Sequence, residues 1–152
     1  MRRVRAAAVV AALTTLSGCS LLQEGAGQVL LPQVAVGECT DLAFAEDGST
    51  SEVSEVATVD CAEPHKYEAF AEVQVDLKGD YPGEGAITAM SDDFCYDSYE
   101  PYVGVALDDS ELVMTFLAPT AEGWKQLRDR TITCFVGLED GGITGSLKGS
   151  KR

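Results

Sequence analysis

The sequence is poor in the side chains on which most catalysis depends. Its 152 residues include one histidine, His65, and one tryptophan, Trp124. It contains no GxSxG motif, which would present the nucleophile of an α/β-hydrolase, and no close cysteine pair such as CxxC, which would indicate a zinc site. Residues 145–150 are rich in glycine and serine but lack the spacing of a phosphate-binding loop. We therefore predict no catalytic residue, no metal site, no cofactor and no enzymatic activity.

Positive charge is also scarce. The chain has 11 Lys+Arg against 25 Asp+Glu, and the pI expected from its sequence is about 4.2. Such an acidic surface repels nucleic acid and anionic lipid headgroups, so we expect no nucleic-acid partner. The segments Asp47-Gly48-Ser49 and Asp108-Asp109-Ser110-Glu111 could touch calcium, but they lack the spacing of an EF-hand, and solvated loops are the better interpretation.

No uncharged run is long enough to cross a membrane, which takes roughly 20 apolar residues. Three arginines among the first five residues precede the uncharged run 6–16, a pattern typical of an export signal. The run ends in Leu16-Ser17-Gly18-Cys19, which resembles the lipobox of bacterial lipoproteins. In that motif the cysteine is lipidated, for example with palmitate, and more than one acyl chain gives firm anchoring. The alternative is an ordinary signal peptide that leaves Cys19 as a free thiol.

These features predict three parts. Residues 1–18 form a lipoprotein signal peptide, residues 19–34 a tether lipidated at Cys19, and residues 35–152 an extracytoplasmic domain. Without the three leader arginines, 8 basic and 25 acidic residues remain. Charge therefore cannot hold the protein to the membrane, and we expect the lipid anchor alone to place it on the outer face of the cell membrane.

The remaining cysteines are Cys39, Cys61, Cys95 and Cys134. An even number in an exported domain indicates two disulfides, for which three pairings are possible. Cys39 and Cys61 stand at strand ends on either side of the first loop. Cys95 lies on the apolar face of the expected helix, and Cys134 on the apolar face of a strand. We therefore predict the pairs Cys39–Cys61 and Cys95–Cys134, the second joining the helix to the sheet.

The hydrophobic pattern predicts several strands and one main helix. The strand segments are 33–40, 56–61, 67–75, 112–118 and 131–138. The helix begins near Ile87 and ends at or before Glu100, because Pro101 disfavours helical conformation in the residue before it. The expected fold class is α+β: an antiparallel sheet of four or five strands with one main helix packed on it and two disulfides.

Four finer expectations follow from the same pattern. Segments 56–61 and 67–75 should be antiparallel neighbours across the Pro64 turn. In 67–75, five apolar residues alternate with polar ones and should share one face: Tyr67, Ala69, Ala71, Val73 and Val75. Phe70 interrupts the polar face, which indicates that this face is partly covered. Segment 112–118 is apolar on both faces and so should be a central strand. Thr120 is a plausible N-cap for a short helical turn that carries Trp124.

His65 and Trp124 are the two candidate partner-binding residues. A lone histidine could act as a general base, but the better interpretation is that His65 bonds backbone in the Pro64 turn and fixes the strand connection. Trp124 could anchor a protein or a sugar at the surface, although a lone tryptophan beside a strand is more often a lid on the core.

Several motifs together resemble the septum formation domain of actinobacterial envelope proteins. The most specific is Cys61-Ala62-Glu63-Pro64-His65, with Glu68 and Phe70 after it. The others are Val36-Gly37-Glu38-Cys39, Tyr81-Pro82-Gly83, Cys95 within a helix, Pro119-Thr120 before Trp124, Asp129-Arg130 before Cys134, and Gly145-Ser146-Leu147. The resemblance implies a membrane-tethered extracytoplasmic module linked to cell division, and it brings no catalytic residues with it.

The function expected from all of this is that of a non-enzymatic binding or scaffold module with a lipid anchor. Its partner would be a protein or a cell-wall component, and its place the division septum. An alternative is an envelope protein that binds a small ligand or a cation through its acidic surface. An envelope hydrolase comes third.

Overall fold

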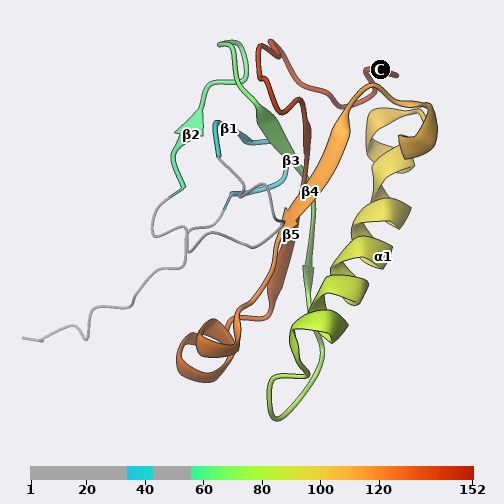
Figure 1. The fold of residues 1–152 in the computed structure, drawn as a ribbon. Helices are drawn as coiled ribbons and strands as arrows, with labels where there is room; N and C mark the ends of the chain where they lie inside the picture. Colours follow the sequence, from blue (N-terminus) through green and yellow to red (C-terminus); the bar gives the residue numbers. More distant parts are fainter. Residues whose placement is uncertain (1–33, 43–55) are drawn as a thin grey trace, which may run out of the picture.

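The computed structural model describes residues 34–42 and 56–152 (Figure 1). Expectations for the signal peptide, for Cys19 and for residues 47–49 fall outside the described residues, as does all but the last residue of the tether. Five strands form one antiparallel sheet in the order β2-β1-β3-β5-β4. Helix α1 lies against one face of it (Figure 1). The elements are β1 (Cys39–Thr40), β2 (Thr58–Val59), β3 (Tyr67–Gln74), α1 (Glu84–Val103), the turn η1 (Leu107–Asp109), β4 (Val113–Leu117), the turn η2 (Gly123–Leu127) and β5 (Thr131–Gly137).

The fold class is as predicted: an α+β domain with a five-stranded antiparallel sheet, one main helix and two disulfides. The core lies on both faces of the sheet. Every fourth residue of α1 is buried, which gives the stripe Ile87, Ser91, Cys95, Tyr99 and Val103. This stripe packs over Phe70, Ile132 and Cys134 of the sheet. A second cluster on the other face contains Val34, Leu42, Tyr67, Ala69 and Phe135.

Strand β3 does not keep its apolar residues on one face, so that expectation was wrong. The register between β3 and β5 shifts between Ala69 and Ala71, where a β-bulge adds a residue. An inserted residue moves everything after it to the opposite face. Tyr67 and Ala69 therefore join the second cluster, whereas Ala71 and Val73 pack on the helix side. Glu68 and Phe70 are on the helix side as well, so the bulge places Ala71 and Val73 on the same face as these two residues.

Two expectations about strand order were also wrong. Strands β2 and β3 are not neighbours, because β1 lies between them and Cys39 pairs with both Val59 and Glu68. Strand β4 is at the edge of the sheet and not at its centre. It is apolar on both faces because both faces are covered there: Met114 and Phe116 pack on the helix side, and Val113 and Leu117 on the other.

Helix α1 runs past Pro101 to Val103, further than predicted. A proline in the last turn removes only one helical hydrogen bond, and burial of Tyr99 and Val103 on either side offsets that loss. The helix ends at Gly104, whose φ of 89° is left-handed and whose N–H donates to the Glu100 carbonyl over 2.8 Å. Among the described residues, no helix combines the length and the apolar character needed to cross a membrane.

Residues 138–152, which we call the C-terminal clasp, form part of the fold. Ile143 and Leu147 are buried in the helix-side cluster. The backbone of Ile143 exchanges hydrogen bonds with that of His65, over 2.9 and 3.0 Å. Further along, the Lys151 N–H donates to the Val103 carbonyl over 2.9 Å. The clasp thus connects the turn before β3 with the C-terminal end of α1, a path that Figure 1 shows in red.

Candidate partner-binding face

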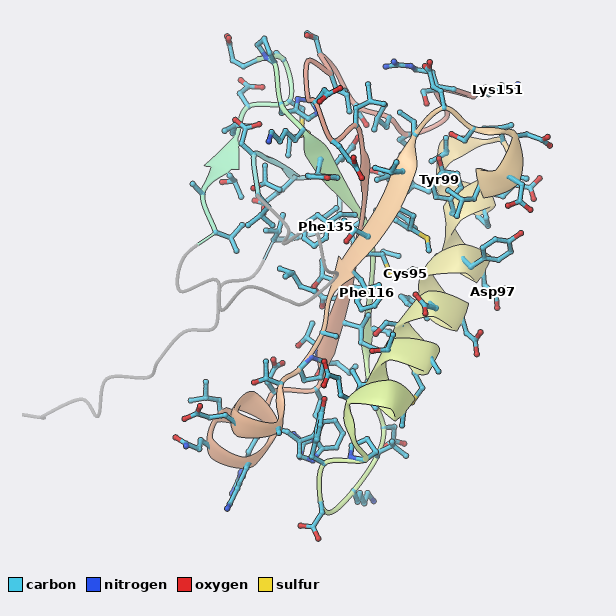
Figure 2. The ribbon with its side chains drawn as sticks, in the orientation of Figure 1. Cys95, Asp97, Tyr99, Phe116, Phe135 and Lys151 are labelled. Atoms are coloured by element: carbon cyan, nitrogen blue, oxygen red, sulfur yellow. A yellow bond between two sulfur atoms is a disulfide. The ribbon has the colours of Figure 1, made fainter. Side chains whose placement is uncertain are left out.

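Both predicted disulfides are confirmed. Cys39 and Cys61 join β1 to the turn before His65, with their Cα atoms 5.3 Å apart. Cys95 and Cys134 join α1 to β5, with a Cα separation of 5.6 Å, and both are fully buried (Figure 2). In the chain-entropy model, loops of this length contribute about 3–4 kcal/mol each. The first bridge thus fixes the turn before β3 to the sheet, and the second fixes the middle of α1 to the middle of β5.

His65 lies inside the molecule, 1% exposed, where β3 begins. Its Nδ1 is 2.9 Å from the Glu63 carbonyl oxygen, which can only accept, so Nδ1 carries the proton and donates. The other ring nitrogen, Nε2, is buried with no hydrogen-bond partner among the described residues. Together with the backbone pair to Ile143, this geometry matches the structural interpretation of His65, which fixes the connection into β3.

Trp124 is also buried, 2% exposed, in the turn η2. Its indole N–H donates to the Gly79 carbonyl over 3.0 Å, and the Arg130 guanidinium lies 3.4 Å from the ring centroid. Thr120 begins this turn as predicted, since its Oγ1 accepts from the Gly123 N–H over 3.0 Å. Trp124 thus holds the turn η2 against the loop that contains Gly79 and Tyr81. Neither His65 nor Trp124 presents its ring to solvent, and partner contact through them stays a prediction.

The buried carboxylate of Glu68 was not anticipated. Glu68 is fully buried and accepts three hydrogen bonds, from the Tyr102 hydroxyl (2.8 Å), the Ser146 hydroxyl (2.6 Å) and the Leu147 N–H. Burial and the bond to Glu68 both raise the pKa of Tyr102 above its ordinary value. The cluster joins β3, α1 and the C-terminal clasp.

The sequence contains the residues of this cluster, but the alternating pattern of the strand conceals that they come together. Simple alternation places Glu68 opposite the apolar residues of its strand, and only the bulge after Ala69 turns Ala71 and Val73 to the face that Glu68 shares with α1. Because its carboxylate has three donors and no exposed surface, Glu68 is placed to hold the fold together and not to meet a ligand.

Two adjoining hollows lie on the surface beside α1, and together they form what we call the α1–β4 groove. One, of about 530 Å³, lies at the C-terminal end of α1 against Ala106 and Leu107. The other, of about 500 Å³, lies between α1 and Met114 of β4. Tyr96 and Asp97 line both hollows, so they stand at the middle of the groove.

The groove is acidic and carries one prominent aromatic ring. Tyr96 is 50% exposed, and its hydroxyl is 3.4 Å from Asp108. The charge of Asp108, more than any other cause, raises the pKa of Tyr96, so the hydroxyl stays protonated at neutral pH. Asp97 points away from the sheet, whereas Cys95 and Tyr99 point toward it (Figure 2).

Acidic residues dominate the chain segment that forms the groove, and Lys151 and Arg152 reach only its C-terminal end, near Gly104 and Glu111. The sequence has no lysine or arginine between Lys78 and Lys125, a span that includes all of α1, η1 and β4. The acidic residues of the same span are Asp80, Glu84, Asp92, Asp93, Asp97, Glu100, Asp108, Asp109, Glu111 and Glu122. No group of three or more His, Cys, Asp or Glu side chains in the part of the chain that the structure describes is arranged to hold a metal ion. The face suits a positively charged partner.

The family model for septum formation matches residues 36–150. This span includes every strand and helix described above, both disulfides and the groove. Comparisons with curated proteins and with solved structures gave no match. Septum formation is not a known enzyme family. The match covers about three quarters of the chain and confirms the resemblance seen in the sequence, and the chain therefore belongs to the septum formation family.

Proposed function

We propose that this protein is a lipid-anchored extracytoplasmic module that binds a partner during septum formation and catalyses no reaction. The observation that carries the proposal is the family match, which indicates a role in septum formation and cell division. It spans the whole described fold, so that role belongs to this domain itself.

A binding role is supported by the contrast between the polar side chains that are buried and those that are exposed. The three side chains that most resemble catalytic groups or anchors, His65, Glu68 and Trp124, are buried and bonded within the fold. The exposed groove instead offers carboxylates, a tyrosine ring and the thioether of Met114, which suit recognition of a partner. Cys19, with its lipobox-like sequence, would keep this domain close to the membrane surface.

Localisation in dividing cells tests the septal role. A fluorescent fusion of the full chain, expressed at native level, should concentrate at the division site. Uniform staining of the cell envelope would contradict the proposal.

Labelling with a palmitate analogue tests the anchor. The full chain should incorporate the label, and Cys19→Ala should lose both label and membrane attachment. Ser20→Ala is the matched control, because it changes the neighbouring residue and should leave labelling intact. Membrane attachment of the Cys19→Ala variant would contradict the lipid anchor.

A further inference from the structure

The two edges of the sheet differ in how they are protected. At one edge, β2 is only two residues long and lies close to the Cys39–Cys61 bridge. At the other, β4 has five residues, Val-Met-Thr-Phe-Leu, paired in continuous register with β5. Among residues 34–42 and 56–152, no strand pairs with the outer side of β4.

Natural proteins protect edge strands with short length, lysine, proline or bulges, because an open edge can pair with another chain. Strand β4 has none of these: it is uncharged, contains no proline or glycine, and has no bulge against β5. All five of its residues are half-buried. The edge of β4 therefore has the features of a pairing site that has been left open.

The surroundings of this edge select the partner. Asp92, Asp93 and Asp97 of α1 line the same hollow as Met114, so the surface between α1 and β4 carries negative charge. Glu111, just before the strand, is paired with Arg152 over 2.7 Å and is less available. Pairing of two copies along β4 would bring the two sets of carboxylates together, which like-charge repulsion opposes. An extended segment with basic side chains would be attracted instead.

We propose that β4 accepts an extended, lysine- or arginine-bearing segment of a partner protein as a sixth strand. Backbone hydrogen bonds to β4 would supply affinity, as in other cases of strand addition. Because side chains alternate along a strand, basic residues two apart would lie on the helix side, toward the acidic surface of α1, while those between them would face the side of Val113 and Leu117. This inference names the partner class for the function proposed above and rests on it.

A designed peptide tests both parts of the inference. The probe is a nine-residue peptide of alternating lysine and threonine, titrated into the full chain in nonionic detergent and followed by fluorescence anisotropy. We expect saturable binding that weakens as salt rises. We also expect amides of β4 to gain protection from hydrogen exchange. A peptide with glutamate in place of lysine should not bind.

The backbone contribution is tested on the peptide, which leaves the protein intact. Methylation of alternate peptide nitrogens keeps every charge but removes the donors that strand pairing needs, and should weaken binding at least tenfold. Equal binding of the methylated and unmethylated peptides would overturn strand addition.

The acidic contribution is tested on the protein. The triple variant Asp92→Asn, Asp93→Asn, Asp97→Asn should bind at least tenfold more weakly. The matched control changes three exposed acids outside the groove, Glu63→Gln, Glu139→Gln and Asp140→Asn, and should bind like the unmodified chain. Equal losses in both triples would overturn the site. Dimerisation of the chain alone, lost on addition of peptide, would identify a second copy as the occupant and would also overturn it.

These measurements and the localisation experiment fail independently. A chain that binds the peptide but stains the envelope uniformly contradicts the septal role. A chain that gathers at the septum but ignores the peptide contradicts strand addition.

Discussion

The end of the molecule where the C-terminal clasp meets β3 and the side where α1 meets β4 use the same kinds of residue in opposite ways. At the clasp, the carboxylate of Glu68 is enclosed by three donors, and the backbone of His65 is paired with Ile143. At the α1–β4 groove, carboxylates face solvent beside a strand edge that no described strand covers. The difference separates what stabilises the domain from what remains free to bind.

The largest loss of stability should come from adding a side chain at Gly137, where the neighbouring backbone leaves no room for one. A Cβ on Gly137 would lie 2.0 Å from the Lys66 carbonyl oxygen and 2.6 Å from Cδ1 of Tyr67. Gly137→Ala must therefore displace backbone, and we expect a loss of about 3 kcal/mol in the free energy of unfolding, measured by urea denaturation. The control is Gly85→Ala in the exposed first turn of α1, where a Cβ meets nothing within 4 Å and alanine should stabilise slightly. Equal effects of the two substitutions would mean that the backbone around Gly137 shifts at little energetic cost.

Removing the carboxylate at the clasp should have the next largest effect. Glu68→Ala leaves the Tyr102 and Ser146 hydroxyls and the Leu147 N–H without their acceptor, and we expect a loss of about 2–3 kcal/mol. Glu72→Ala is the matched control, because Glu72 is an exposed glutamate on the same strand, and it should change stability by under ~0.5 kcal/mol. If thermal and urea unfolding do not distinguish the two variants, Glu68 does not hold the clasp.

High pH should weaken the clasp through Tyr102. Its pKa is raised in the folded state, first by burial and then by Glu68, whereas the unfolded chain releases this proton near pH 10. The stability due to neutral Tyr102 is therefore complete below pH 10 and is lost as pH rises above it. Unfolding free energies measured between pH 9 and 11 should fall, and Tyr102→Phe should make the fall shallower. An unchanged slope in that variant would show that Tyr102 titrates alike in both states. Tyr67 and Tyr99, whose pKa values are raised by burial, account for part of the slope that remains.

The smallest effect on stability should come from the groove. The exposed carboxylates Asp92, Asp93 and Asp97 make few bonds within the fold, so their conversion to asparagine should change the free energy of unfolding by under ~0.5 kcal/mol. Differential scanning calorimetry at low and high salt measures this. A loss comparable to that of Glu68→Ala would erase the distinction between the two regions and would make the groove a structural feature.

The sequence was sufficient for whatever depends on local periodicity and on cysteine placement. The apolar face of α1 predicted which side would carry Cys95, and the alternation of β5 did the same for Cys134, so the disulfide between them followed. The N-cap at Thr120 and the backbone bond of His65 are equally local, because each involves neighbours two or three residues away.

The expectations that were wrong depend on how segments far apart in the sequence are arranged in space. Nothing in the residues around Ala69 marks a bulge, yet the bulge decides that Ala71 and Val73 share the helix side with the buried Glu68. The insertion of β1 between β2 and β3 is a matter of topology, and the edge position of β4 is hidden because both of its faces are covered. The groove was missed for the same reason, since it needs α1 and β4 side by side.

The position of the clasp has a consequence for how the domain is made. Glu68 finds two of its three donors at Ser146 and Leu147, 78 and 79 residues further along the chain. If the chain were exported amino end first, residues 1–145 would be across the membrane before those donors arrived. The cluster around Glu68 could then close only after those residues had crossed, so the polypeptide would stay open while it threads.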